Sequence, residues 1–264
     1  MKYAFLLVAF AICLKLNAQQ KLNIQYEARY ELKFKEFKNQ NPEKKINTFI
    51  LLFNKDESFI KNMNVYVKDS LISNGKIKLT GDDMKDLAIN TKYYTDLPYT
   101  IYKKGSQINY STELAGNEYK YTETVEFKWK ISRETKIVNG VKCVKATTTK
   151  WGRNWIAYYS PKHPMPFGPY KFHGLPGLIF EIHDEGNDYS FSMYRFKKRK
   201  ESDFRLFNYS KAKLITKKQI EKIRHNYAVA PIEATVDGEP DFQKKMLRYK
   251  LDREKNYNPI ELTE

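Results

Sequence analysis

The feature that most constrains the fold is a strict alternation of apolar and polar residues close to the N-terminus. From Leu22 to Phe34, in "LNIQYEARYELKF", every even-numbered residue is apolar over thirteen positions. Successive side chains of a strand point to opposite faces of a sheet, whereas a helix brings together residues three and four apart. A period of two sustained this long predicts a β-strand with one face on a core and the other in water.

Turn residues support a β-rich fold. Asn139-Gly140 stands between apolar residues, and both residue types tolerate the positive φ angles of a two-residue type I′ hairpin. Further hairpins are predicted at Lys104-Gly105 and around residues 185–187. Short strands are expected at 58–63 and 64–72, and the basic run 197–200 is expected to close the third hairpin as a solvated end.

The hydrophobic period changes in the last third of the chain. Thr216 and Gln219 have capping-box spacing, with apolar residues on one helical face after them, and a second helix is predicted over 240–253. We therefore expect an α+β fold, mainly β, with one antiparallel sheet and helices mostly in the C-terminal third. A single domain over 19–264 is preferred to a division near residue 210.

The N-terminus has the pattern of a secretory signal peptide. Lys2 precedes twelve apolar residues, which are too few to cross a bilayer, and small or tolerated residues follow up to Ala18. We expect cleavage after Ala18 and a periplasmic or secreted protein with no transmembrane segment after signal removal. A lipoprotein signal at Cys13 is disfavoured because Ile12 occupies a position that requires a small residue. Cys143 then has no partner in the chain, and we expect it to be buried and inert.

The formal net charge of +16 favours anionic partners such as lipid headgroups, acidic glycans or another envelope component. A compositional bias toward Lys, Asn, Ile and Tyr explains part of this charge. No nucleic-acid-binding module is present, so nucleic acid is not an expected partner.

Catalytic and metal motifs are missing from the sequence. It has no Gly-x-Ser-x-Gly, phosphate loop, His-Glu-x-x-His or Cys-x-x-Cys, so no cofactor and no catalytic residue is predicted. Glu181, His183 and Glu185 alternate on one strand face, and His163 and His173 lie ten residues apart. Neither arrangement fixes a coordination geometry, and no metal is expected.

Five of the ten prolines lie between residues 161 and 176, which predicts an extended, ordered excursion between two strands. Aromatic residues near it could line a cleft for sugar rings or acyl chains, or they could simply fill the core. The candidate ligand-binding residues are Trp155, Tyr158, Tyr170, Phe172 and His173.

The excursion ends in "GLPGLI", residues 174–179, followed by an apolar run. Pro176-Gly177 fits the centre of a type II turn, in which Gly177 supplies a positive φ. Gly174 is expected to permit a close approach of the chain, and the residues from Leu178 onward are expected to enter the sheet as a buried strand. The motif is therefore predicted to be structural.

This hexapeptide resembles the GLPGLI family of exported proteins from Gram-negative bacteria. The stretches "GVKCVKATTT" (140–149), "GPYKF" (168–172) and "NPIEL" (258–262) support the resemblance. The family has no established activity, so the resemblance implies no catalytic residues. The succession of strand, Asn-Gly turn, strand and proline excursion is also distantly similar to lipoprotein-carrier (LolA-like) domains. That similarity implies a curved sheet, or half-barrel, that binds acyl chains.

The function we expect is that of an exported, noncatalytic, envelope-associated binding or accessory protein for a lipid, a peptide or an envelope component. One alternative is a partner subunit of an outer-membrane uptake or secretion system. Another is a hydrolase of envelope or host polymers that combines dispersed carboxylates with His173 or His183.

Overall fold

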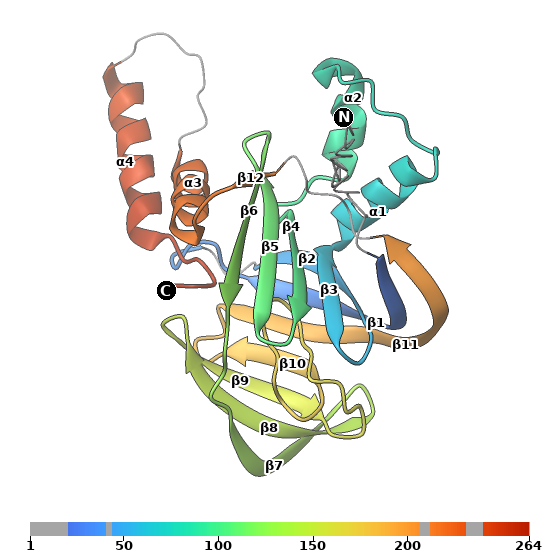
Figure 1. Cartoon of the computed structure of the whole chain (residues 1–264). Coiled ribbons are helices and arrows are strands. Elements are labelled where there is room, and N and C mark those ends of the chain that lie inside the picture. Colours follow the sequence, from blue (N-terminus) through green and yellow to red (C-terminus); the bar gives the residue numbers. More distant parts are fainter. Residues whose placement is uncertain (1–20, 41–43, 206–211, 231–239, 264) are drawn as a thin grey trace, which may run out of the picture.

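The computed structural model describes residues 21–40, 44–205, 212–230 and 240–263, which form a twelve-stranded sheet and four helices (Figure 1). The proposed signal peptide, residues 1–18, lies outside the described residues. The elements in chain order are β1 Lys21–Phe34, β2 Lys45–Phe53, β3 Glu57–Asn62, α1 Met63–Ser73, α2 Asp83–Lys92, β4 Tyr99–Lys104, β5 Gln107–Leu114, β6 Asn117–Thr124, β7 Lys130–Val138, β8 Val141–Lys150, β9 Arg153–Ser160, β10 Leu178–Asp184, β11 Tyr189–Arg205, β12 Lys213–Leu214, α3 Lys217–Val229 and α4 Pro240–Asn256.

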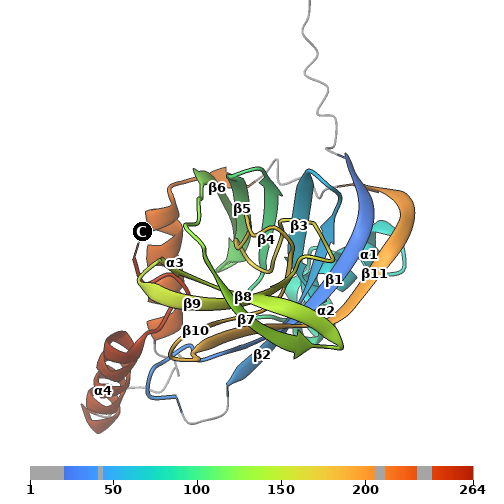
Figure 2. The ribbon, with the colours of Figure 1, turned by 90° about the horizontal axis from the view of Figure 1, so that it is seen from below.

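The sheet is curved and does not close. Its strand order is β12-β6-β5-β4-β3-β2-β1-β11-β10-β9-β8-β7, and every pair is antiparallel except β12 with β6. The long strands β1 and β11 join two wings of the sheet, β2–β6 and β7–β10 (Figures 1 and 2). The expected mainly-β fold with a curved antiparallel sheet is confirmed.

From Ala28 to Phe34 the alternation in β1 identifies the face that packs on the main core, whereas a register shift between Ile24 and Tyr26 interrupts it near the start of the strand. Its even-numbered residues Ile24, Ala28, Tyr30, Leu32 and Phe34 are all buried. Four of them join the main core on the concave side, while Ile24 belongs to a small second cluster with residues of β2 and β3.

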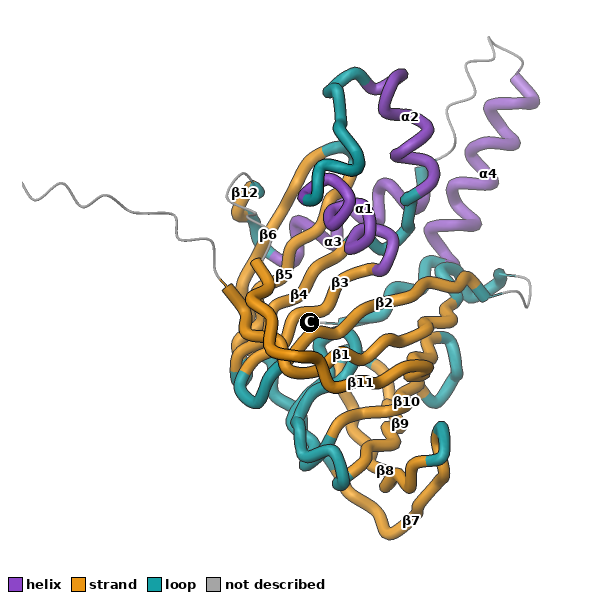
Figure 3. The backbone as a smooth tube through the Cα atoms, turned by 90° about the vertical axis from the view of Figure 1, so that its right-hand side faces the viewer, coloured by secondary structure: helices purple, strands orange, loops and turns teal. Residues whose placement is uncertain are grey.

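The helices gather at one end of the curved sheet (Figure 3). Thr216 caps α3 with the expected capping box to Gln219, which confirms that prediction. The predicted strand over 64–72 is wrong, because these residues belong to α1. Asn62 caps this helix by accepting a hydrogen bond from the backbone of Asn64 at 2.9 Å, and Lys61 of β3 pairs with Asp69 on the helix. None of the helices in the described ranges is long and apolar enough to cross a membrane.

Two local predictions about β7 and β8 are confirmed. Asn139 and Gly140 both have positive φ, 50° and 75°, as a type I′ turn requires. Cys143 on β8 is fully buried and free, and burial raises the pKa of its thiol to about 11.

The basic run 197–200 does not close a hairpin as expected. It lies in the middle of the seventeen-residue strand β11 and pairs with β1. There Lys197 and Arg199 form ion pairs with the buried carboxylate of Glu27, at 3.4 and 3.2 Å. The long pairing with β1 explains why the strand continues past the basic residues.

The proline-rich excursion, residues 161–177, crosses the inside of the curved sheet (Figure 2). The fully buried Lys103 of β4 donates hydrogen bonds from Nζ to the carbonyls of Gly168, Tyr170 and Phe172 at 3.0, 3.1 and 3.1 Å. Burial acts to lower the pKa of Lys103 to about 7. The three carbonyls act in the opposite direction, because only the ammonium form has three protons to donate. One side chain thus ties the excursion to the opposite wing of the sheet.

The turn in "GLPGLI" differs from the prediction. Gly177 has no positive φ, and its amide bonds to the carbonyl of Leu175 at 2.7 Å, which closes a three-residue turn around Pro176. A Cβ on Gly177 would lie 2.2 Å from the carbonyl oxygen of Ser160, whereas Gly174 has a φ of +89°. Close approach therefore explains Gly177, and positive φ explains Gly174, whose added Cβ would meet nothing closer than Nε1 of Trp129 at 3.9 Å. The predicted type II turn and the close approach predicted at Gly174 are both wrong. Entry into a buried strand at Leu178 is confirmed.

Gly177→Ala is expected to lower the free energy of unfolding by about 2 kcal/mol or more, because backbone must move to admit the methyl group. The matched control is Gly186→Ala. Gly186 has no positive φ, and its added Cβ would meet nothing closer than a carboxylate oxygen of Asp184 at 3.6 Å. The control should change stability by less than about 0.5 kcal/mol in urea unfolding. Equal stability of the two variants would contradict the close-approach explanation.

Candidate functional site

A cavity of about 900 Å³ lies at the helical end of the sheet. Strands β1 and β4–β6 form one wall, and α1, α3 and the C-terminal segment 257–262 form the others. Many of the lining residues are aromatic, namely Phe34, Tyr93, Tyr94, Tyr99, Tyr110, Tyr121, Tyr170, Tyr189, Tyr227 and Tyr257. The cavity is large enough for a small organic ligand.

A buried ion cluster lies against this cavity, which its members Tyr121, Tyr170 and Glu261 line. Lys171, from the proline excursion, is fully buried, and its Nζ lies 2.5 Å from Oε1 of Glu261 and 2.8 Å from the hydroxyl of Tyr121. Glu123 of β6 also pairs with Lys171. Four aromatic rings surround the ammonium group at 5.3 to 5.6 Å, those of Tyr110, Tyr121, Trp151 and Tyr170. Cation–π contact and ion pairing together offset the cost of burying this charge.

Glu261 is the centre of the cluster. It pairs with Lys217 of α3 as well as with Lys171, and the hydroxyl of Tyr170 donates to it at 2.5 Å. Burial alone would raise the pKa of Glu261, but the charges of Lys171 and Lys217 outweigh it and hold the pKa below its ordinary value. The carboxylate thus joins the excursion, α3 and the C-terminal segment.

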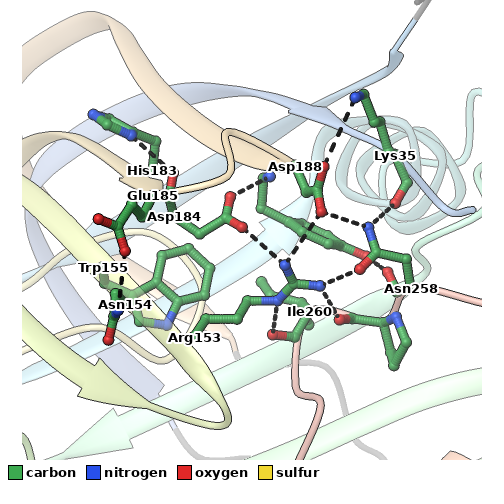
Figure 4. A network of polar contacts seen from close by, with 12 residues as sticks. Lys35, Arg153, Asn154, Trp155, His183, Asp184, Glu185, Asp188, Asn258 and Ile260 are labelled. Carbon is green, nitrogen blue, oxygen red and sulfur yellow. Dashed lines mark hydrogen bonds and ion pairs between the residues drawn. The ribbon is translucent and has the colours of Figure 1, made fainter. Parts of the chain in front are cut away.

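The C-terminal segment reaches this position because Arg153 of β9 clamps it (Figure 4). The guanidinium pairs with Asp184 at 2.8 Å and donates to the Asn258 side chain at 2.6 Å. It also donates to the carbonyls of Pro259 and Ile260, at 2.7 and 3.1 Å. "GPYKF" and "NPIEL" are therefore packed together, although they lie about ninety residues apart.

Arg224 of α3 occupies a different part of the cavity wall. Its Nη2 donates to the hydroxyl of Tyr110 at 2.5 Å, and the guanidinium lies 5.8 Å from the centre of the same ring. Among the residues whose side chains the structure describes, no carboxylate forms an ion pair with Arg224. The ring of Tyr99 lies 5.9 Å from that of Tyr110, and the buried hydroxyl of Tyr99 has no hydrogen-bond partner in the described part of the chain.

The structure brings only one of the five candidate ligand-binding residues to the cavity. Tyr170 lines it, whereas Trp155 and Phe172 are fully buried and pack on each other with ring centroids 4.7 Å apart. Tyr158 stacks under Lys136 at 4.8 Å, outside the cavity. His173 is partly buried against Phe127, and its Nδ1 lies 2.8 Å from the carbonyl oxygen of Lys171.

Glu181, His183 and Glu185, the potential metal ligands on one strand face, each contact another protein group. Glu181 pairs with Lys136 at 2.7 Å, and Glu185 accepts a hydrogen bond from Asn154 at 3.0 Å (Figure 4). Nδ1 of His183 lies 3.0 Å from the carbonyl oxygen of Asp184. Within the described residues, no group of three or more His, Cys, Asp or Glu side chains could hold a metal ion.

Sequence reasoning did not identify Arg224, Tyr110, Lys171 or Glu261 as site residues. A signal for Arg224 was present, because it follows Ile220 by four residues and therefore lies on the buried face of α3. A lysine between two aromatic residues in "GPYKF" was a weaker signal. Nothing local in "NPIEL" shows that its carboxylate is buried.

No protein-family model matches the chain, and no curated protein matches it either. Among solved structures, PNGF-II in space group C2 is similar with a TM-score of 0.51 and 16% identity, over 78% of this chain and 33% of that one. PNGF-II in space group P21 gives a TM-score of 0.49 and 15% identity, over 78% of this chain and 34% of that one. The chain thus spans about a third of these proteins' length. At 16% identity, the likeness to the first of them concerns the fold alone.

Glu261→Gln is expected to lower the free energy of unfolding at pH 7 by about 3 kcal/mol, because Lys171 and Lys217 both lose a buried carboxylate. The folded-state pKa of Glu261 lies below the ordinary value of 4.5. Its contribution to stability is therefore complete above about pH 4.5 and is lost as the pH falls through the folded-state value.

Urea unfolding at several pH values tests this expectation. The difference in stability between the wild-type protein and Glu261→Gln should shrink below about pH 4.5. Glu126→Gln is the control, because Glu126 is an exposed carboxylate outside the cluster. A difference for Glu261→Gln that stays constant down to pH 3 would show that its charge is not what stabilises the fold.

Proposed function

We propose that this chain is an exported, noncatalytic binding protein of the cell envelope that holds a small ligand in the cavity between the sheet and α3. The cavity carries this proposal, because its volume of about 900 Å³ and its aromatic walls match those of small-molecule sites. The proposal of export rests on the N-terminal signal pattern and on the resemblance to the GLPGLI family, to which we propose the chain belongs. The ligand classes that we propose for the cavity are a lipid, a peptide and a glycan component of the envelope.

The residues that line the cavity favour binding over hydrolysis by His173 or His183. A hydrolase needs an acid and a base that meet in one cleft. Neither His173 nor His183 lines the cavity. The carboxylate of Glu261, which does line it, is already engaged by two lysines.

The outer helix α4 supports a second role as a partner subunit of an outer-membrane system. Leu247 and Leu251, one helical turn apart, are 57% and 53% exposed. Such residues on one helix face are suited to contact with another protein. Leu247→Lys/Leu251→Lys should then abolish co-purification of a specific outer-membrane protein while leaving ligand binding intact.

Thermal unfolding of residues 19–264 with panels of phospholipids, glycan fragments and peptides tests the binding proposal. A ligand at a hundred times its dissociation constant should stabilise the protein by about 2.7 kcal/mol. For a domain of this size that is a rise in Tm of roughly 5 to 10 °C. An unchanged Tm across all three panels would contradict the proposal.

A cavity-filling variant shows where the ligand binds. Val65→Trp places a large ring at the α1 wall of the cavity and should weaken binding at least tenfold. Ile137→Trp is the matched control, because Ile137 is exposed on the edge strand β7. Equal affinity of the two variants would place the ligand elsewhere.

A further inference from the structure

Four cations that line the cavity form no ion pair with a carboxylate of the described residues, namely Lys68, Lys218, Lys222 and Arg224. Lys68 bonds to Asn90, and Lys218 and Lys222 are exposed, whereas Arg224 is partly buried. The inner carboxylates are already paired with lysines: Glu36 and Asp96 with Lys45, Asp69 with Lys61, and Glu261 with Lys171 and Lys217. Glu221 lies 3.9 Å from Lys217, and Glu113 and Glu118 are exposed at the rim. Arg224 has only the neutral hydroxyl of Tyr110 as a hydrogen-bond partner among the described side chains.

The chemistry of arginine makes this arrangement unusual. A guanidinium group stays charged at physiological pH and has five N–H donors in a planar fork. One of these donors is used by Tyr110, and the others have no protein acceptor in the described part of the chain. Two parallel N–H groups of such a fork bind both oxygens of a carboxylate or phosphate.

Tyr99 provides a second, independent indication of a ligand. Its side chain lines the cavity and is only 4% exposed, and its hydroxyl has no partner among the described residues. A buried hydroxyl without a partner costs free energy. The ring of Tyr99 lies 5.9 Å from the ring of Tyr110, whose hydroxyl accepts the hydrogen bond from Arg224, so both groups belong to the same part of the cavity.

We propose that Arg224 and the hydroxyl of Tyr99 together bind the anionic oxygen group, a carboxylate or a phosphate monoester, of a ligand whose apolar or ring-bearing body packs on the cavity's aromatic wall. This inference rests on the proposed function and adds the chemical class of the ligand. The guanidinium supplies the charge and the paired donors, and the phenol of Tyr99 supplies one more.

Matched probes separate the charged group from the body that carries it. The probes are octanoate and octanamide, phenylacetate and phenylacetamide, and octyl phosphate and octanol, titrated into residues 19–264 by calorimetry. The anionic member of at least one pair should bind at least tenfold more tightly than its neutral partner. The two kinds of anion decide between a carboxylate and a phosphate ligand.

Three variants assign the effect to the residues. Arg224→Gln should weaken binding of the anion at least tenfold and leave the neutral partner's affinity unchanged. Tyr99→Phe removes only an unpartnered hydroxyl, so it should keep or raise the Tm and weaken the anion about threefold to tenfold. Arg133→Gln is the control, because Arg133 is exposed on β7 and should have no effect.

Each result has one meaning. Equal affinity for anionic and neutral probes would overturn the inference, and so would full anion binding by Arg224→Gln. In either case the proposed function would stand as long as Val65→Trp still blocks binding. If Arg224→Gln does not fold, unchanged anion binding by Tyr99→Phe would overturn the inference instead. Absence of binding by every probe and every member of the lipid, glycan and peptide panels would remove the proposed function as well.

Discussion

The buried ion pair between Lys171 and Glu261 is the contact on which the packing of the interior depends. Both side chains are buried, and a buried charge without its partner destabilises a fold by several kcal/mol. The pair joins the proline excursion to the C-terminal segment, and through Lys217 it also holds α3. The cavity exists where these three segments meet the sheet, so its shape depends on this cluster.

The excursion itself explains how a strongly curved sheet acquires a solid core. An open sheet with a concave face would leave a large apolar surface in water, and helices cover only one end of it. The excursion fills the other end with Phe172 and neighbouring aromatics, and Lys103 fixes its backbone from the opposite wing. What remains open is the space near Arg224, lined by tyrosines that present both ring faces and hydroxyl groups.

The features that could be predicted from sequence are those encoded locally. The alternation in the second half of β1, the Asn139-Gly140 turn and the Thr216 capping box each depend on residues within one element, and all three are confirmed. The role of Gly177 could not be deduced, because it depends on the carbonyl of Ser160, which only the folded chain brings close. The same holds for Glu261 and Lys171, which are ninety residues apart in sequence. Export and membership of the GLPGLI family stay predictions.

We expect Lys171 and Glu261 to stabilise the protein as a pair. A double-mutant cycle with Lys171→Met, Glu261→Gln and the double variant, measured by urea unfolding at pH 7, tests this coupling. We expect a coupling energy of about 2 kcal/mol or more, because the second substitution removes a charge that the first has already left unpaired. Effects of the two single substitutions that add to within about 0.5 kcal/mol would contradict this expectation.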